Sequence, residues 1–264
     1  MAPRQESHQR VSTMTFGLFV INLARSTQRR ERILGSLAEV GLEAQIWEAV
    51  DGATLDPAHA PRYDQHERRR RFGHDLTPNE IACALSHLGC IEAAWKSGLE
   101  KVCILEDDVT VVPEFPDVLK ACLALPPGVD MVKFYGLRHR RHRVVCSLTP
   151  THSLIRPLHA TCGTQGYLLD RVGMEKALAA CSPLVMQIDI SLDRYWENGM
   201  RLFAVSPAPL IEPGSLPSDI QAPRVDPWRA DRDHRLRLRL KAHKLQDSIR
   251  RHWSNLTGGF NRLP

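Results

Sequence analysis

The stretch Lys101-Val102-Cys103-Ile104-Leu105-Glu106-Asp107-Asp108 sets an apolar run directly against three carboxylates. The run is typical of a buried strand. Carboxylates at the end of such a strand need a positive partner, because a charge that leaves water unpaired is costly. Oxygen ligands suit Mg²⁺ or Mn²⁺, metals that commonly hold phosphate-bearing substrates. The stretch therefore predicts a divalent metal site; the alternative is a simple turn made by Asp107-Asp108.

The three carboxylates are candidates for different contacts. Glu106 and Asp108 are the candidate metal ligands, and Asp107 is a candidate contact to a ribose or to a metal-bound water. A metal held there would bridge two phosphate oxygens and neutralise charge on the leaving group. Spacing alone does not decide which carboxylate takes which part.

Two other predicted strands also end in polar residues. Phe16–Ile21 is followed by Asn22, and Gln45–Val50 is followed by Asp51, with a segment of helical periodicity between them. A strand-helix-strand unit is typical of a parallel sheet. Since ligands of open α/β sheets bind outside the carboxyl ends of the strands, we expect Asn22, Asp51 and Glu106 to line one crevice.

The remaining elements are predicted from periodicity and from Gly and Pro residues. Thr77-Pro78-Asn79-Glu80 has the pattern of a capping box and predicts a helix that ends near Gly98. Residues 56–75, with Arg68 to Arg71, are expected to form a mobile surface loop whose arginines lie in solvent or contact an anionic group. A second basic loop, residues 138–143, has the same two interpretations. Further helices are expected over 26–41, 172–181 and 188–196, and further strands over 130–135, 161–169 and 201–205.

Composition indicates an ordinary soluble protein of 264 residues, 43% hydrophobic and 25% charged. Apolar runs fall short of the roughly 18 residues that a membrane span needs. Residues 1–15 are polar, are expected to be disordered, and lack the apolar core of a secretory signal. The seven cysteines include no Cys-x-x-Cys pair, which favours reduced, buried thiols in a cytosolic protein.

The net charge of +5 is unevenly distributed. Residues 228–264 hold ten Lys or Arg and three Asp, which leaves 25 basic and 27 acidic residues elsewhere. Apolar residues of this tail fall on one helical face, namely Leu238, Ala242, Leu245, Ile249, Trp253 and Leu256. The pattern predicts a basic amphipathic helix that either lies on an anionic membrane surface or packs its stripe on the body. Nucleic acid is not an expected partner, because no recognition motif accompanies the charge.

Four blocks of the chain together resemble glycosyltransferase family 25, which includes lipopolysaccharide-type glycosyltransferases and the collagen galactosyltransferases. The blocks are Val20-Ile21-Asn22-Leu23 with Arg29-Arg30, Leu76 to His87, Ile104 to Val109, and Gly163-Thr164-Gln165-Gly166-Tyr167. The order and spacing of the four blocks fit the family pattern over about residues 16–212. Only the four blocks together, and no single one of them, are specific for the family. Ala82 departs from the pattern, because the family usually has Gly there.

The resemblance implies a fold and a reaction. The fold would be α/β of the GT-A type, with a Rossmann-type, mostly parallel sheet flanked by helices over residues 16–212, a linker over 213–227 and the basic helical tail over 228–264. The donor would be a sugar nucleotide, commonly UDP-galactose, with Mn²⁺ or Mg²⁺ and inversion at the anomeric carbon.

The resemblance also implies roles for individual residues of this chain. Glu106, Asp107 and Asp108 match the acidic metal and nucleotide motif. The uridine and phosphates would be held by the nucleotide half, at Asn22, Arg25, Arg29 and Asp51. Glu80 and His87 fall in the helical block, and Gly166, Tyr167 and Asp189 fall in the half that faces donor sugar and acceptor.

Inversion in a single displacement needs one base for the acceptor hydroxyl. Asp189 is the first candidate, since it follows an apolar residue and starts a predicted helix; the alternative is a plain helix cap. His87 is the second candidate, with a hydrogen-bonded helix histidine as its alternative. Asp193, one turn after Asp189, is the third and could support it.

The sequence thus predicts a cytoplasmic glycosyltransferase, peripheral on the inner face of the membrane. It would move a hexose, galactose in the first instance, from a UDP-sugar to a lipopolysaccharide-type or lipid-linked glycan. A metal-dependent phosphodiesterase or nuclease would use the same acidic and basic residues, and a non-catalytic glycan-binding relative would keep the fold alone.

Overall fold

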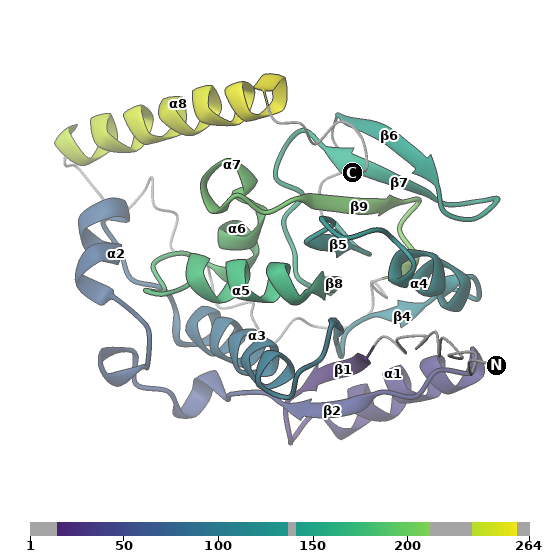
Figure 1. Cartoon of the computed structure of the whole chain (residues 1–264). Helices are drawn as coiled ribbons and strands as arrows, with labels where there is room; N and C mark the ends of the chain where they lie inside the picture. Colours follow the sequence, from purple (N-terminus) through teal and green to yellow (C-terminus); the bar gives the residue numbers. More distant parts are fainter. Residues whose placement is uncertain (1–14, 137–140, 212–233, 258–264) are drawn as a thin grey trace, which may run out of the picture.

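The computed structural model describes residues 15–136, 141–211 and 234–257. Within them, one mixed sheet has the strand order β2-β1-β3-β8-β5-β9-β7-β6 (Figure 1). Its strands are β1 (Phe16–Asn22), β2 (Gln45–Glu48), β3 (Lys101–Glu106), β5 (Met131–Lys133), β6 (His142–Ser147), β7 (Ser153–Pro157), β8 (Gly166–Asp170) and β9 (Leu202–Ser206). A separate small ladder pairs β4 (Thr110–Val111) with β10 (Leu210–Ile211).

Most strands of the sheet run in one direction. β2, β1 and β3 are mutually parallel, as are β5 and β9. β8 is antiparallel to both β3 and β5, while β7 is antiparallel to both β9 and β6. Within this sheet of described strands, only β7 and β8 therefore run against the others, which confirms the predicted α/β fold with a mostly parallel sheet flanked by helices.

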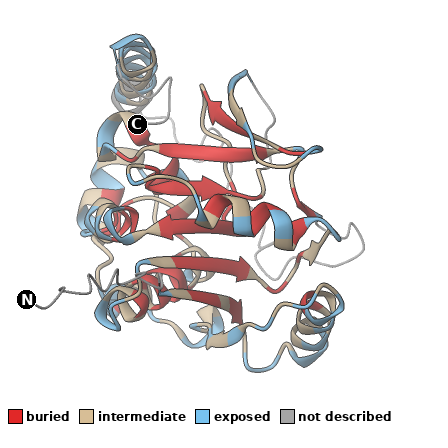
Figure 2. Ribbon diagram, turned by 45° about the vertical axis from the view of Figure 1, so that its right-hand side comes forward, coloured by how far each residue is buried: buried red, intermediate tan, exposed pale blue. Residues whose placement is uncertain are grey.

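Helices cover both faces of the sheet. The described helices are α1 (Thr27–Glu39), α2 (Gln65–Phe72), α3 (Pro78–Lys96), α4 (Phe115–Leu123), α5 (Arg171–Ala180), α6 (Ile188–Asp193), α7 (Tyr195–Asn198) and α8 (His234–Thr257), with 3₁₀ turns η1 (Gly52–Thr54) and η2 (Pro57–His59). The apolar side chains of α1 and α4 join one core cluster, and those of α3, α5 and α6 join the other. Figure 2 shows that the strands between them are largely buried.

Helix α3 sets the position of the functional residues. Its capping box forms as predicted, because the Thr77 hydroxyl accepts from the Glu80 N–H while the Glu80 carboxylate accepts from the Thr77 N–H. The helix is buried along most of its length, between the sheet and α5. This placement brings Cys83 and His87 beside Glu106 at the end of β3.

The expected loop over residues 56–75 was wrong, because it contains η2 and α2. Helix α2 lacks an apolar stripe, but both of its ends are capped. Asp64 accepts from the Glu67 N–H at the start, and Gly73 ends the helix in a left-handed conformation. Arg68 is 3% exposed and donates to the carbonyls of His74 and Val185. Neither interpretation of the four arginines, solvent or an anionic ligand, holds for this one.

Two further expectations needed correction. Within the second basic segment, His142 and Arg143 belong to β6, which pairs with β7; residues 138–140 lie outside the described part of the chain. The helix expected over 188–196 is interrupted at Arg194, which separates α6 from α7. The disorder expected for residues 1–15 falls, except for Thr15, on residues that are not described, as does the linker over 213–227.

Helix α8 rests on the body through polar side chains. Arg194 donates to both carboxylate oxygens of Asp247 at 2.5 and 2.6 Å, and Asn255 accepts from the Tyr195 hydroxyl at 2.9 Å. Ala242 of the apolar stripe is exposed, and its large side chains are each more than half exposed, at Leu238, Leu245, Ile249, Trp253 and Leu256. The alternative in which this stripe packs on the body is therefore wrong. No described helix is both long enough and apolar enough to cross a bilayer.

Candidate active site

A pocket opens where β1 and β3 end, over the first turns of α3. It is lined by Ile21, Leu23, Arg25, Arg29, Ala49, Val50, Gly52, Asn79, Ala82, Cys83, Ser86, His87, Glu106, Asp107 and Asp108. The three carboxylates that follow β3 thus share one pocket with two arginines and with the residues that follow β2. This is the edge of the sheet at which α/β folds bind ligands.

Asp107 is held from two sides by the protein itself. The Asn22 amide donates to its Oδ2 at 2.6 Å, and Arg29 Nη1 lies 3.5 Å from its Oδ1. Arg30 in turn donates to Asn22 Oδ1 at 2.8 Å. Burial raises the pKa of Asp107, while the Asn22 and Arg29 contacts oppose that rise. Asp107 is therefore a fixed anchor of the turn after β3, and Asn22 lies behind it.

Glu106 stands in a chain of hydrogen bonds. Its Oε1 accepts from the Thr164 hydroxyl at 2.6 Å and lies 3.3 Å from His87 Nε2, while His87 Nδ1 is 2.8 Å from the buried Tyr167 hydroxyl. Burial raises the pKa of Glu106, but His87, Thr164 and Lys133 outweigh it and lower the pKa below its usual value. The tautomer with the proton on Nε2 donates to Glu106 and accepts from Tyr167 at Nδ1, whereas the other tautomer donates from Nδ1 to Tyr167.

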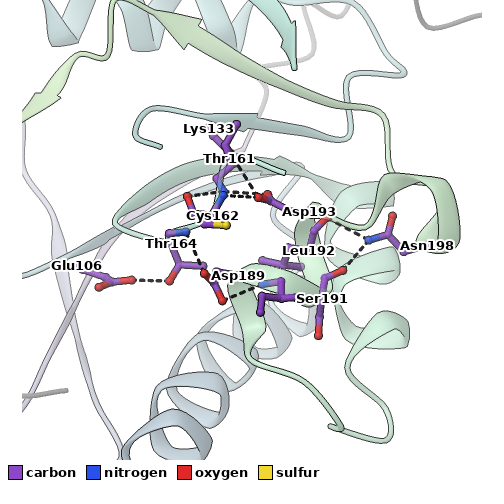
Figure 3. Close-up of polar contacts among 12 residues, drawn as sticks. Glu106, Lys133, Thr161, Cys162, Thr164, Asp189, Ser191, Leu192, Asp193 and Asn198 are labelled. Atoms are coloured by element: carbon purple, nitrogen blue, oxygen red, sulfur yellow. Dashed lines mark hydrogen bonds and ion pairs between the residues drawn. The ribbon is translucent and has the colours of Figure 1, made fainter. Parts of the chain in front are cut away.

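Asp189 and Asp193 hold the segment that contacts Glu106 (Figure 3). The Gly163 N–H donates to Asp189 Oδ2 at 3.1 Å, one residue before Thr164 contacts Glu106. Asp193 accepts from the Cys162 N–H at 2.6 Å and from Lys133 Nζ at 2.9 Å. The segment 161–164 is thereby fixed between the metal-ligand candidate and the base candidate.

The pocket is rich in negative charge around one thiol. Burial raises the pKa of Cys83 well above its usual value, and four nearby carboxylates raise it further, those of Glu106, Asp189, Asp108 and Glu80. Of these residues, Glu106 and Asp108 line the pocket together with Asp107, and carboxylate oxygens are the donors that Mg²⁺ or Mn²⁺ prefers. The residues present thus fit the metal ion that the sequence predicts.

The other predicted site residues lie around the pocket rather than in its lining. Asp51 forms an ion pair with Arg25 and caps η1. Glu80 closes its capping box and accepts from Gln187 at 2.9 Å, so its carboxylate serves the helix start.

Gly166 and Tyr167 lie in β8, behind the pocket. A Cβ at Gly166 would meet the Leu210 side chain at 2.1 Å, so a larger residue there would force the buried Leu210 side chain to move. Tyr167 is fully buried, and its hydroxyl lies 2.8 Å from His87 Nδ1. The binding roles assigned to both residues remain predictions.

Sequence reasoning missed three residues that shape the site. Thr164 and Lys133 are brought to Glu106 and Asp193 by the order of strands in the sheet, which no local pattern encodes. Cys83 was read as one of several buried thiols. Its spacing of four from His87 on a predicted helix was the available signal, because such pairs share a face.

Comparison with known proteins supplies the family. The family model described as "Glycosyltransferase family 25 (LPS biosynthesis protein)" matches residues 16–192. "Inactive glycosyltransferase 25 family member 3" of Mus musculus is 38% identical over 120 residues, which cover 40% of this chain and 19% of that protein. "Procollagen galactosyltransferase 2" of Homo sapiens is 28% identical over 178 residues, which cover 62% of this chain and 27% of that protein.

A solved glycosyltransferase involved in the glycosylation of the major capsid of PBCV-1 aligns with 61% of this chain and 62% of its own, at 12% identity. Its TM-score of 0.34 is too low to carry a conclusion about this chain. The family match rests on the sequence, since it spans well over half of the chain and includes the acidic stretch and the start of α6. The chain belongs to glycosyltransferase family 25.

Proposed function

We propose that this protein transfers a hexose from a UDP-sugar to a lipopolysaccharide-type glycan, with inversion at the anomeric carbon. Galactose is the leading candidate for the hexose. The observation that carries the proposal is the pocket in which Glu106, Asp107 and Asp108 meet Arg25 and Arg29. Carboxylates for a cation and arginines for phosphate oxygens are the two contacts that a metal-bound nucleoside diphosphate needs.

Glu106 and Asp108 would hold Mn²⁺ or Mg²⁺ in this proposal. When bound, the ion supplies charge neutralisation at the diphosphate leaving group. The protein contributes the placement of these groups: Thr164 and His87 fix Glu106, and Asn22 fixes Asp107. Fixed groups lose little freedom when substrate arrives, which lowers the cost of reaching the transition state.

Asp189 is the proposed base. Its two oxygens accept from the N–H groups of Gly163 and Ile190, which orient the carboxylate and leave further lone pairs for a substrate proton. In the reaction the acceptor oxygen bonds to the anomeric carbon, its proton passes to Asp189, and the bond from that carbon to the phosphate oxygen breaks. His87 is the second candidate, although its two nitrogens already contact Tyr167 and Glu106.

A non-catalytic, glycan-binding role is the second candidate function. It is favoured by the similarity to a family member whose name describes it as inactive. The matches cover 19% and 27% of the lengths of the two curated relatives described above, so the activity of either whole protein reaches this chain only as a proposal. A phosphodiesterase would be distinguished by release of sugar phosphate in place of nucleoside diphosphate.

We further propose that α8 attaches the protein to an anionic membrane surface, where lipid-linked acceptors reside. The exposed apolar stripe lies opposite the face that binds the body through Asp247 and Asn255. Seven basic residues accompany it in the helix sequence: Arg235, Arg237, Arg239, Lys241, Lys244, Arg250 and Arg251. An apolar face with basic flanks is typical of helices that lie in a membrane interface. The proposed location is the inner face of the cytoplasmic membrane.

The test is a screen of sugar nucleotides for release of UDP, with and without Mn²⁺. The expected result is Mn²⁺-dependent release of UDP from a UDP-hexose, with UDP-galactose as the leading donor. An exposed carboxylate outside the pocket provides the control, since Asp117→Asn on α4 should release UDP at the normal rate. Metal-dependent UDP binding without release from any donor would favour the non-catalytic role.

A further inference from the structure

A second set of metal-ligating atoms lies in the same pocket. The sulfur of Cys83, a ring nitrogen of His87 and a carboxylate oxygen of Glu106 all lie within 4.8 Å of one another. Cys83 and His87 are four residues apart on α3, so they project from one face of the helix. Glu106 reaches them from the end of β3.

The spacing of these atoms suits a tetrahedral ion. Zinc binds imidazole nitrogen and carboxylate oxygen at about 2.0 to 2.2 Å, which sets two such ligands about 3.3 Å apart in a tetrahedron. His87 Nε2 and Glu106 Oε1 are 3.3 Å apart. The two atoms therefore need little movement to share one ion.

Hydrogen bonds from neighbouring residues already orient the side chains of His87 and Glu106. The Tyr167 hydroxyl lies 2.8 Å from His87 Nδ1, the ring nitrogen that would remain free of metal, and the Thr164 hydroxyl donates to Glu106 at 2.6 Å. Ligating histidines almost always use their second nitrogen in such a hydrogen bond, and ligating carboxylates are likewise hydrogen-bonded. Tyr167 is fully buried, so its position is fixed by the core.

The chemistry of the donors selects the kind of metal. A thiolate and an imidazole favour Zn²⁺, whereas Mg²⁺ and Mn²⁺ favour carboxylate oxygen. All three residues line the pocket, which gives an ion a way in and leaves a fourth position open to solvent or substrate.

We propose that Cys83, His87 and Glu106 bind a zinc ion at a site distinct from the carboxylate set of Glu106 and Asp108. Because Glu106 belongs to both sets, zinc would exclude the metal that holds the sugar nucleotide and so inhibit transfer. That exclusion rests on the proposed function; the binding of zinc does not.

Cobalt(II) titration of the full chain tests the binding directly, because tetrahedral Co²⁺ with a thiolate ligand has visible bands and a near-ultraviolet charge-transfer band. The expected result is a saturable spectrum that Zn²⁺ abolishes. Cys83→Ser should remove the charge-transfer band, while Cys146→Ser, a partly exposed thiol on β6, should leave it unchanged. Tyr167→Phe should weaken the apparent affinity by about 10- to 100-fold, as expected for an outer contact.

Two results would overturn the site: no charge-transfer band in the wild-type protein, or an undiminished band in folded Cys83→Ser. Near-ultraviolet circular dichroism of each variant verifies that it is folded. The proposed function fails separately if UDP does not bind with Mn²⁺ while the cobalt spectrum persists. The zinc proposal fails alone if UDP binds with Mn²⁺ and the thiolate band is missing.

Discussion

Asp189 and Asp193 are one turn apart on the same helix, yet their surroundings are opposite. Asp193 is 1% exposed and pairs with Lys133, which is equally buried; it also accepts from the Cys162 N–H. Asp189 is half-buried and accepts from the N–H of Gly163, the next residue along the same segment. The Asp193 carboxylate thus stabilises the protein behind the site. The Asp189 carboxylate remains close to the carboxylates of the pocket. The difference teaches that a shared helix and residue type do not imply a shared role.

The largest expected effect is on a pocket carboxylate. Asp108→Ala should abolish transfer, with a loss of at least about 10³-fold in kcat/KM, because metal charge stabilisation supplies several kcal/mol and 1.36 kcal/mol corresponds to tenfold. The melting temperature should change little, since Asp108 is only half-buried. Steady-state UDP release with Mn²⁺ measures the loss. Near-normal turnover would count decisively against the carboxylate site.

The second largest effect is expected at Asp189, where a substitution should affect catalysis rather than folding. Asp189→Asn should lower kcat by about 10² to 10⁴-fold, the usual contribution of a general base, while UDP affinity with Mn²⁺ stays the same. Calorimetry of UDP binding and transfer kinetics on the same preparation measure both quantities. A variant that keeps turnover but loses UDP affinity would make Asp189 a binding residue rather than the base.

Asp193→Ala should act on folding. Removing one partner of a buried ion pair costs about 3 to 5 kcal/mol, because Lys133 would remain as an uncompensated buried charge. Urea unfolding measures the loss in free energy. The matched control is the double variant Lys133→Met with Asp193→Leu, which removes both charges and should recover most of the stability. A single variant as stable as the wild-type protein would mean that the pair does not hold the segment 161–164.

The smallest effect concerns α8, which has its own two faces. Trp253→Ser with Ile249→Ser should weaken binding to anionic vesicles at least about tenfold, because each large apolar side chain contributes about 1.5 to 3 kcal/mol when buried. Gln246→Ser, exposed on the same helix, is the control. Point variants are preferable to truncation, which would leave Arg194 without Asp247. Unchanged vesicle binding would rule out the membrane role.

Local patterns predicted much of the fold and part of the site. The capping box at Thr77, the first strand-helix-strand unit and the acidic end of β3 each depend on neighbours in sequence, and the structure has all three. The strand ends do meet at one pocket, since parallel strands present their carboxyl ends at one edge. Of the three residues expected to line it, however, only Glu106 does so, whereas Asn22 and Asp51 lie outside the lining.

What could not be predicted depends on distant partners. Helix α2 has no apolar stripe, and the β6–β7 hairpin carries basic residues that resemble a loop. The Lys133–Asp193 pair joins residues 60 apart. The direction of the α8 stripe is set by the contact from Arg194 to Asp247, which no periodicity reveals.

The most direct test of the carboxylate site is anomalous diffraction from crystals soaked in Mn²⁺ and UDP. We predict one manganese peak between the diphosphate and the side chains of Glu106 and Asp108. A diphosphate bound in the pocket with manganese absent from these two carboxylates would contradict the account.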